Sequence, residues 1–436
     1  MSINQYIKPI TAERKDGELY IGGISAVELA KKYGTPLYVI DEATLRGIAR
    51  EYKEAFKDYK NVRMMYASKA LCTSAVTKIL DEEGFGFDTV SAGEIYTVYK
   101  AGVKMEKVLF NGNNKTPREI ELALRLGVGR YSVDNFYEAE LLNKIAEEKG
   151  VKADILIRIT PGIECHTHDY IQTGQIDSKF GFDLTQTDEI ITLIKNEYKN
   201  LVIRGIHAHI GSQIFELQSY TDEVEILIKE IMRINEVHSL SLDEINIGGG
   251  LGVKYTDGDN PPDVHALADA VAKTMKKYTS NLPTIDLEPG RSIISTSGIT
   301  LYTAGSSKVV PNGRKYVAVD GGMADNPRPS MYQAKYFAEI ADNTDGRETE
   351  KITLAGRYCE SGDILIEEIE LPQIKADDTI CVYNTGAYNY SMASNYNRVE
   401  KPSMVLVNNS QSDIIVSRES LEDLISKDSI PSRLNK

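Results

Sequence analysis

From about residue 40 to residue 295, short apolar runs alternate with longer amphipathic runs. The short runs suit buried strands, and the amphipathic runs suit helices that bury one face. The apolar runs predict eight strands, at 62–68, 84–90, 107–112, 129–134, 154–160, 203–211, 244–250 and 284–290. The helical patterns include 41–59, 72–82, 92–100, 117–126, 136–149 and 221–237. Eight strand–helix units with short connections predict an α/β fold, a (β/α)8 TIM barrel over residues 39–295.

Residues 296–436 carry a different pattern, in which short apolar runs are separated by frequent turn residues. The runs KYVAVDGG, KITLAGRY, DILIEEIELP, DTICVYNTG and SMVLVNN predict strands, with one helix-like insert near 391–395. Two more strand candidates, at 18–23 and 36–40, precede the barrel. We therefore expect a discontinuous all-β domain, barrel-like or sandwich-like, from residues 1–38 and 296–436. The competing fold, an open doubly wound sheet, usually has a G-x-G-x-x-G after its first strand, and none is found there.

Composition and charge narrow the class of protein. With 436 residues, 42% of them hydrophobic and 26% charged, the chain can build two globular domains. A net charge of −14 argues against nucleic acid or an anionic membrane as the main partner, although a local basic pocket can still hold an anionic substrate. The sequence has no run of about 18 apolar residues, which a membrane span needs. The start, MSINQYIKPI, lacks the features of a secretory signal, so we expect a cytoplasmic protein.

The chain has few cysteines, and they are widely spaced. Cys72, Cys165, Cys359 and Cys381 form no C-x-x-C pair. Sparse cysteines in a long chain of this kind predict free thiols rather than a disulfide framework, and one of them is a candidate catalytic group.

Polar side chains stand where most of the predicted barrel strands end. In barrels of this kind the chemistry takes place at the carboxyl ends of the strands, and packing does not explain charged groups there. In chain order these side chains are Lys69, Asp88, Asn111, Asn113, Arg158, His207, His209, Ser212, Glu288 and Arg291.

Lys69 follows the first strand and precedes a helix, so it points into the barrel mouth rather than lying on the surface. A lysine shielded from water loses its proton more easily and becomes a nucleophilic amine. Such an amine can form a Schiff base with an aldehyde cofactor.

Glycine-rich segments, INIGGGLG and LEPGRS, follow the seventh and eighth strands. The loops at these two positions often hold a phosphate in such barrels, and glycine N–H groups approach an anion without a side-chain clash. One such loop is often no more than a tight turn. Two of them together favour a phosphate site that includes Gly249, Gly250 and Gly290.

Glu288 ends the eighth strand. Such a glutamate is either a solvated loop residue or a partner for a cofactor. Facing a pyridine nitrogen, it would keep that nitrogen protonated, and a pyridinium ring is a better electron sink for the loss of carbon dioxide.

His207 and His209 form an H-x-H pair at the sixth strand, which is a possible metal site. The other four histidines do not fall at suitable strand ends, so we favour an imidazole stacked on an aromatic cofactor and expect no metal. The segment CHTH at 165–168 resembles a zinc motif in composition, but we interpret it as a loop.

The β-rich region adds three polar segments: DNPRPSMY (325–332), GRYCESGD (356–363) and NTGAYNYSM (384–392). Arg291, Arg328 and Tyr332 together could clamp a carboxylate, because a guanidinium matches it with two hydrogen bonds. Taken singly, each of these residues is more simply a turn or surface residue.

Taken together, YASKA, HAHIGSQ, NIGGGLG, EPGRS, NPRPSMY, RYCESGD and GAYNYSMASNYN resemble the signature segments of the diaminopimelate decarboxylases. These enzymes have the alanine-racemase-like fold of pyridoxal phosphate (PLP) enzymes, a barrel and a β-domain. The resemblance extends over essentially the whole chain, in the family's order, and includes the stretch 158–182.

This resemblance implies a role for each matching residue. Lys69 would hold PLP in Schiff-base linkage, His209 would stack on its ring and Glu288 would pair with its nitrogen. Cys359 would return a proton to the carbanion, and Lys69 is the alternative donor. The remaining cofactor contacts would be Asp88, Arg158, Ser212, Gly249, Gly250, Gly290, Arg291 and Tyr388. The substrate contacts would be Arg291, Arg328, Tyr332, Glu360 and Tyr388. In this family Cys359 and its neighbours come from the partner subunit, which implies a homodimer with shared active sites.

The implied reaction is the conversion of meso-2,6-diaminopimelate to L-lysine and carbon dioxide, the last step of lysine biosynthesis. Decarboxylases of ornithine, arginine or carboxynorspermidine share the cofactor machinery, but Glu360 and Ser361 fit diaminopimelate better than the Asp-Gly of ornithine-type enzymes. A PLP racemase would have an arginine in place of Glu288, and a non-catalytic homologue would lack Lys69 or Cys359. A metal-dependent barrel hydrolase is the remote alternative.

Overall fold

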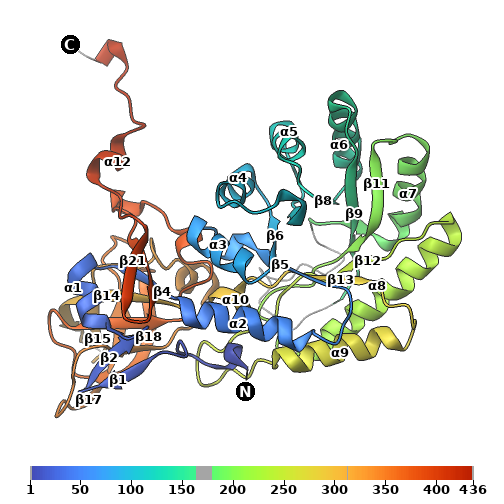
Figure 1. Cartoon of the computed structure of the whole chain (residues 1–436). Helices are drawn as coiled ribbons and strands as arrows, with labels where there is room; N and C mark the ends of the chain where they lie inside the picture. Colours follow the sequence, from blue (N-terminus) through green and yellow to red (C-terminus); the bar gives the residue numbers. More distant parts are fainter. Residues whose placement is uncertain (1, 164–178, 312, 435–436) are drawn as a thin grey trace. The chain divides into compact units, whose positions relative to one another are not determined.

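A computed structural model describes residues 2–163, 179–311 and 313–434 and divides the chain into two compact units (Figure 1). The first unit comprises Met1–Tyr6 and Leu45–Ser295, and the second comprises Ile7–Thr44 and Thr296–Lys436. These boundaries differ from the expected 38/39 division. Strand β4 (Leu37–Asp41) pairs with strands of the second unit, whereas Asn4 donates hydrogen bonds to backbone carbonyls of the first.

The first unit is a closed barrel of eight parallel strands, each paired with the next, and the last pairs with the first. The strands are β5 (Val62–Ala67), β6 (Gly86–Thr89), β7 (Val108–Phe110), β8 (Arg130–Val133), β9 (Ala153–Thr160), β11 (Leu201–His207), β12 (Glu244–Asn246) and β13 (Thr284–Leu287). Every one coincides with a predicted apolar run. The two-residue strand β10 (Phe182–Asp183), beside β9, was not predicted.

Helices alternate with the strands of this unit, and several of them carry capping residues at their ends (Figure 1). The Thr116 side chain caps α5, Pro117 occupies its first turn, and Gly127 ends it in the left-handed conformation at φ 78°. The helices are α2 (Glu42–Ala55), α3 (Ser74–Glu82), α4 (Ala92–Lys100), α5 (Pro117–Leu126), α6 (Phe136–Lys149), α7 (Thr187–Asn196), α8 (Leu217–His238), α9 (Val264–Lys276) and α10 (Arg291–Ile294).

The barrel interior is filled by side chains. Met65, Leu109 and Leu156, from the first, third and fifth strands, pack together in one apolar cluster. Alternate strands supply such a layer in barrels of this type. Gly205 in β11 has no room for a side chain, because a Cβ there would lie 1.8 Å from the carbonyl oxygen of Glu244.

An ion-pair network lies at the amino-terminal ends of the strands. Arg63 contacts Glu244 at 2.8 Å and Asp286 at 2.6 Å, and Arg130 contacts Glu244 at 2.6 Å and Asp154 at 2.9 Å. Asp286 is buried, which raises its pKa to about 6 although Arg63 acts in the opposite direction. The two arginines therefore balance the negative charge of buried carboxylates at the end of the barrel that lies away from the predicted chemistry.

We expect Arg63→Ala to lower the free energy of unfolding by about 2–3 kcal/mol, because Asp286 would stay buried without its cation. Arg63 is partly exposed, so the loss should be smaller than for a fully buried pair. Arg204→Ala, which removes one exposed pair with Asp154, should cost less than about 1 kcal/mol. Urea unfolding of both variants measures the difference, and equal losses would contradict the expectation.

The second unit is built on a sheet in which β14 (Gly298–Val309) and β4 are central. The strands run in the order β18 (Ile364–Pro372), β17 (Thr349–Ala355), β15 (Lys315–Val319), β14, β4, β20 (Ser403–Asn408) and β21 (Gln411–Val416). Strand β19 (Thr379–Tyr383) also pairs with β14, and β16 (Ala338–Ile340) pairs with β19. A smaller sheet contains β1 (Glu13–Lys15), β2 (Glu18–Ile21) and β3 (Ile24–Ser25).

Helix α1 (Ala26–Tyr33) packs on the sheet that contains β4, β14 and β19 and forms an apolar core with it. The core includes Val27 and Leu29 of α1, Val39 of β4, Leu301 of β14 and Cys381 of β19. Helix α1 was not predicted, nor were α11 (Arg328–Tyr332) and α12 (Leu421–Ile425). The expected helical insert near 391–395 is instead two 3-10 turns, Tyr390–Met392 and Tyr396–Arg398.

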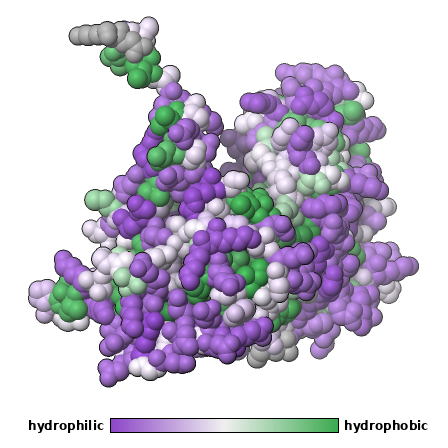
Figure 2. Space-filling model, turned by 60° about the vertical axis from the view of Figure 1, so that its left-hand side comes forward, coloured by the Kyte–Doolittle hydropathy of each residue, from purple (hydrophilic) through white to green (hydrophobic). Residues whose placement is uncertain are grey.

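The face shown in Figure 2 is largely hydrophilic, with hydrophobic residues gathered in smaller patches. Among the described residues, no helix combines the length and the apolar character needed to span a membrane.

Candidate active site

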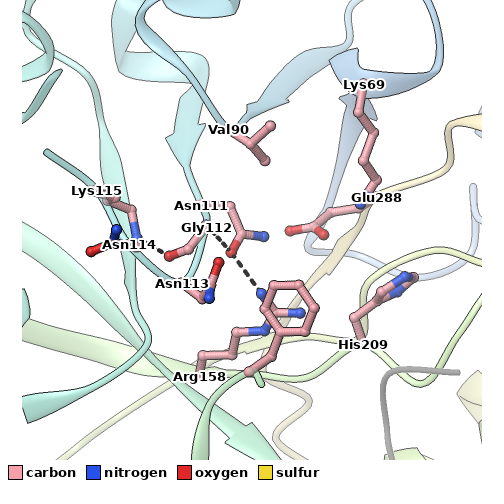
Figure 3. A pocket seen from close by; sticks show the side chains of 11 residues that line it. Lys69, Val90, Asn111, Gly112, Asn113, Asn114, Lys115, Arg158, His209 and Glu288 are labelled. Atoms are coloured by element: carbon pink, nitrogen blue, oxygen red, sulfur yellow. Dashed lines mark hydrogen bonds between the residues drawn. The ribbon is translucent and has the colours of Figure 1, made fainter. Parts of the chain in front are cut away.

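A cavity of about 350 Å³ lies at the carboxyl ends of the barrel strands, where the sequence predicts the chemistry. Figure 3 shows side chains from different strand ends directed toward it, among them Lys69, Arg158, His209 and Glu288. The wall consists of Lys69, Val90, Asn111, Gly112, Asn113, Asn114, Lys115, Arg158, Phe180, His209 and Glu288. This volume suits a small-molecule ligand.

Lys69 lies in a single 3-10 turn, Ser68–Ala70, directly after β5. The flanking Ser68 and Ala70 are buried, while Lys69 itself is half-buried and lines the cavity. The amine therefore reaches the barrel mouth from a rigid backbone. That is the arrangement a covalent amine nucleophile needs.

Glu288 follows β13 and is buried. Asn246 donates a hydrogen bond of 2.7 Å to Glu288 Oε1, and His207 Nε2 lies 3.5 Å from Oε2. Burial by itself would raise the pKa of Glu288. The hydrogen that His207 directs at the carboxylate and the positive charge of Lys69 act in the opposite direction and hold that pKa below its usual value, so the carboxyl is ionised.

His209 lies beyond the end of β11, on the cavity wall. The backbone N–H of Gly249 donates to its Nδ1 at 3.3 Å, so the neutral ring carries its hydrogen on Nε2. Burial, and then the positive charge of Lys69, lowers the pKa of His209 well below the usual value. A flat, uncharged imidazole is therefore presented to the cavity.

The H-x-H pair is not arranged as metal ligands. His207 is the last residue of β11, and its Nδ1 lies 2.7 Å from Ser132 Oγ, while His209 contacts the Gly249 backbone. Across residues 2–163, 179–311 and 313–434, no three His, Cys, Asp or Glu side chains are grouped so as to hold a metal ion. The CHTH segment at 165–168 lies outside the described residues.

Asp88 and Arg158 are buried ionisable groups at the ends of barrel strands, and Arg158 lines the cavity. Arg158 donates to Asn111 Oδ1 at 3.2 Å, lies 3.5 Å from Asp134 and covers the Phe180 ring at 4.3 Å. Neither carboxylate oxygen of Asp88 has a hydrogen-bond partner. Burial, and then the negative charge of Glu288, raises the pKa of Asp88 to about 8, although Lys69 and Arg158 act in the opposite direction.

This raised pKa predicts a pH-dependent stability. The folded protein holds the Asp88 proton more tightly than the unfolded chain, so the stabilisation is present below about pH 4 and is lost toward pH 8. We therefore expect Asp88→Asn to stabilise the cofactor-free protein at about pH 8.5 by about 1–3 kcal/mol, with little effect near pH 5. Urea unfolding at both pH values checks this, and a variant that is less stable than wild type at the higher pH would contradict it.

The two glycine loops leave no room for side chains. A Cβ at Gly249 would lie 2.1 Å from the Glu288 carbonyl oxygen, and Gly250 has a positive φ of 104°. Beside these loops, the Arg291 guanidinium donates to Ser212 Oγ at 2.9 Å and to Tyr255 OH at 3.0 Å. Backbone, hydroxyl and guanidinium donors of the kind that bind a phosphate are therefore grouped here.

In the second unit, Arg328 and Tyr332 begin and end helix α11. Arg328 is buried, donates to Tyr336 OH at 3.0 Å and lies 5.9 Å from the ring centre of Tyr388. Tyr388 has a φ of +64°, which is uncommon for a bulky residue and typical of functional sites. This unit thus brings together three of the four substrate contacts predicted within it.

The fourth contact, Glu360, and Cys359 are exposed in a turn of the second unit. Asn397 accepts the backbone N–H of Cys359 at 2.9 Å. Burial raises the pKa of the Cys72 thiol to about 12 and that of Cys381 well above its usual value. Cys359 is therefore the exposed thiol among the described cysteines, while Cys165 lies outside the described residues.

Several residues at the site were not predicted from the sequence, among them Asn246, Tyr255 and Lys115. Asn246 contacts Glu288, Tyr255 accepts from Arg291, and buried Lys115 bonds to Glu138 and to the Gly112 and Ser132 carbonyls. Asn246 lies in the segment INIGGGLG, two residues before Gly248, and this was the one available signal. Nothing in the sequence singles out the other two.

Comparisons with known proteins identify the family to which this chain belongs. Residues 45–295 match the family "Pyridoxal-dependent decarboxylase, pyridoxal binding domain". The chain is 44% identical to the diaminopimelate decarboxylase of Synechocystis sp. (99% of this chain and 95% of the relative) and to that of Bacillus subtilis (97% and 98%). The chain belongs to the diaminopimelate decarboxylase family. These relatives match nearly the whole chain, so both units belong to the shared architecture.

Solved structures of the family have the same fold. Diaminopimelate decarboxylase from M. jannaschii in complex with L-lysine superposes with a TM-score of 0.93 at 35% identity, covering 100% of both chains. The Helicobacter pylori enzyme with L-lysine gives 0.86 at 33% identity, covering 92% of this chain and 98% of that one. The barrel with a separate β-rich unit is therefore the architecture of this family.

Proposed function

We propose that this protein converts meso-2,6-diaminopimelate to L-lysine and carbon dioxide, with PLP as cofactor. The convergence of Lys69, His209 and Glu288 on one cavity carries this proposal. An amine, a flat neutral ring and an ionised carboxylate suit the aldehyde, the ring and the ring nitrogen of PLP. The glycine loops with Ser212 and Arg291 suit its phosphate.

Each barrel residue then has a chemical task. When bound, PLP supplies a protonated pyridine ring that accepts the electron pair released with carbon dioxide. Lys69 would hold the cofactor through its aldehyde, and Glu288 would keep the ring nitrogen protonated. His209 packs on the ring, Gly249, Gly250, Gly290, Arg291 and Ser212 hold the phosphate, and Asp88 and Arg158 complete the cofactor contacts.

The second unit supplies substrate recognition in this proposal. Arg328 and Tyr332 bind the distal carboxylate, Glu360 binds the distal ammonium, and Tyr388 contacts both the cofactor and the substrate. Lysine and other simple diamino acids leave the buried arginine without a carboxylate, which disfavours their binding. Cys359 delivers a proton to the carbon that lost carbon dioxide, with Lys69 as the alternative donor.

The assay for this function uses purified protein with PLP and separate samples of meso-diaminopimelate, ornithine, arginine and carboxynorspermidine. We expect release of carbon dioxide and L-lysine with the first substrate and little turnover of the others. Preferential turnover of ornithine, arginine or carboxynorspermidine would identify a related decarboxylase instead. Turnover of none of them would overturn the proposal.

We also propose a homodimer in which Cys359 and Glu360 complete the barrel site of the partner. Their exposure in a turn of the second unit supports this arrangement. Mixing inactive Lys69→Ala and Cys359→Ala proteins should restore part of the activity, because a mixed dimer contains one intact site. Lack of recovery after subunit exchange would exclude shared sites. A cytoplasmic location stays a prediction from the sequence.

A further inference from the structure

Two fully buried side chains act on the Glu288 carboxylate from behind the cavity. The Asn246 amide donates to Oε1 at 2.7 Å, and His207 Nε2 lies 3.5 Å from Oε2. Both residues are 0% exposed, so neither side chain occupies space in which a ligand would bind. They are direct Cα partners on neighbouring strands, His207 at the end of β11 and Asn246 at the end of β12.

The hydrogen position on His207 follows from its neighbours. Burial lowers its pKa, so the ring is neutral and carries one hydrogen. With Ser132 Oγ 2.7 Å from Nδ1, two tautomers are conceivable. A hydrogen on Nδ1 would leave the Nε2 lone pair facing an ionised carboxylate. The favoured tautomer therefore accepts from Ser132 at Nδ1 and directs the Nε2 hydrogen toward Glu288 Oε2, 3.5 Å away, an electrostatic contact longer than a regular hydrogen bond.

Asn246 has a second contact, which links Glu288 to the glycine loop. Its Oδ1 accepts the backbone N–H of Gly248 at 2.8 Å, and the Glu288 N–H donates to the Gly248 carbonyl at 2.6 Å. Gly248 has a positive φ of 61° at the start of the Gly248–Gly250 turn. One amide thus fixes both the carboxylate and the loop beside it.

We propose that Asn246 and His207 are positioning residues that hold the Glu288 carboxylate by presenting a hydrogen to each of its oxygens, with Asn246 also tying it to the glycine loop. This inference rests on the proposed function, since Glu288 is placed there beside the cofactor ring. A buried amide is well accommodated when both its ends are paired, as they are here.

The decisive variant is Asn246→Asp, which keeps the shape and the acceptor for Gly248 but replaces the donor to Glu288 with a second acceptor. Two carboxyl groups at this distance share one proton, so the Glu288 charge becomes pH-dependent. We expect PLP affinity of the cofactor-free protein to fall roughly 10- to 100-fold, the usual worth of a hydrogen bond to a charged group. We also expect a titration step, absent from wild type, in a plot of affinity against pH.

Asn235→Asp is the matched control. The Asn235 amide also makes two hydrogen bonds, but both are with the Leu242 backbone. It donates to the Leu242 carbonyl at 2.9 Å and accepts the Leu242 N–H at 2.8 Å. The control variant should lose stability without a change in PLP affinity or its pH dependence. The inference would be overturned if the Asn246→Asp variant bound PLP as tightly as wild type at every pH. A wild-type protein that fails to bind PLP would instead overturn the proposed function.

Two further variants cover the case in which Asn246→Asp does not fold. His207→Gln keeps a donor, whereas His207→Leu removes it, so PLP affinity should fall more in the second variant. The exchange Asn246→Asp with Glu288→Gln restores a donor–acceptor pair without the Glu288 charge. It should recover the stability of the fold but not the activity. Equal PLP affinity in His207→Gln and His207→Leu would count against His207 as a positioning residue.

Discussion

Replacing Lys69 by alanine is expected to lower decarboxylation on the order of 1000-fold or more. The change removes the amine that lies on the cavity wall after β5, and with it covalent attachment of the cofactor. The wild-type protein should show a visible absorption band that disappears on borohydride reduction, and the variant should not retain it after dialysis. Carbon dioxide release and this band are the two measurements.

Lys69→Arg is the control for charge, because arginine keeps a cation at the site but stays protonated and offers no nucleophilic amine. It should be nearly as inactive as Lys69→Ala while keeping the fold and the circular dichroism spectrum of wild type. Full activity in either variant would remove the basis of the proposed chemistry.

Replacing Glu288 by glutamine is expected to reduce turnover roughly 100- to 1000-fold, with a smaller effect on substrate affinity. The carboxylate is ionised in the folded protein, and its neutral isostere cannot hold a proton on the cofactor ring. Separate measurement of kcat and KM tests this. Glu94→Gln is the matched control, since Glu94 also interacts with Lys69 but lies in the first turn of helix α4, where its side chain accepts the Val90 N–H. An equally large loss of turnover in Glu94→Gln would indicate that removing any negative charge near Lys69 lowers turnover.

The barrel was predictable because its pattern is local. Each strand is an apolar run buried in the barrel, and helices such as α5 carry their own start and stop residues, here Thr116 and Gly127. Strand β14 was missed because Ser, Thr and Gly interrupt its apolar residues, although it is central to the sheet of the second unit. Its stability comes from three pairing partners, which the local pattern does not reveal.

Only those site residues that directly follow a strand could be predicted from the sequence. The rule that chemistry follows the strands identified Lys69, Arg158, His209 and Glu288, which all line the cavity. It could not identify Asn246, because the contact with Glu288 depends on the register of β11, β12 and β13. Register is set by the closed barrel as a whole, so its consequences for side-chain pairs appear only in three dimensions.

The placement of β4 has a consequence for synthesis on the ribosome. This strand leaves the ribosome before the barrel, yet it pairs with β14 and β20, which leave it afterwards. Residues 37–41 must therefore wait unpaired while the whole intervening barrel is translated and can already fold as a unit. Completion of the second unit is thus delayed until β20 has been translated. A nascent chain that ends before residue 403 would leave one edge of β4 exposed to aggregation.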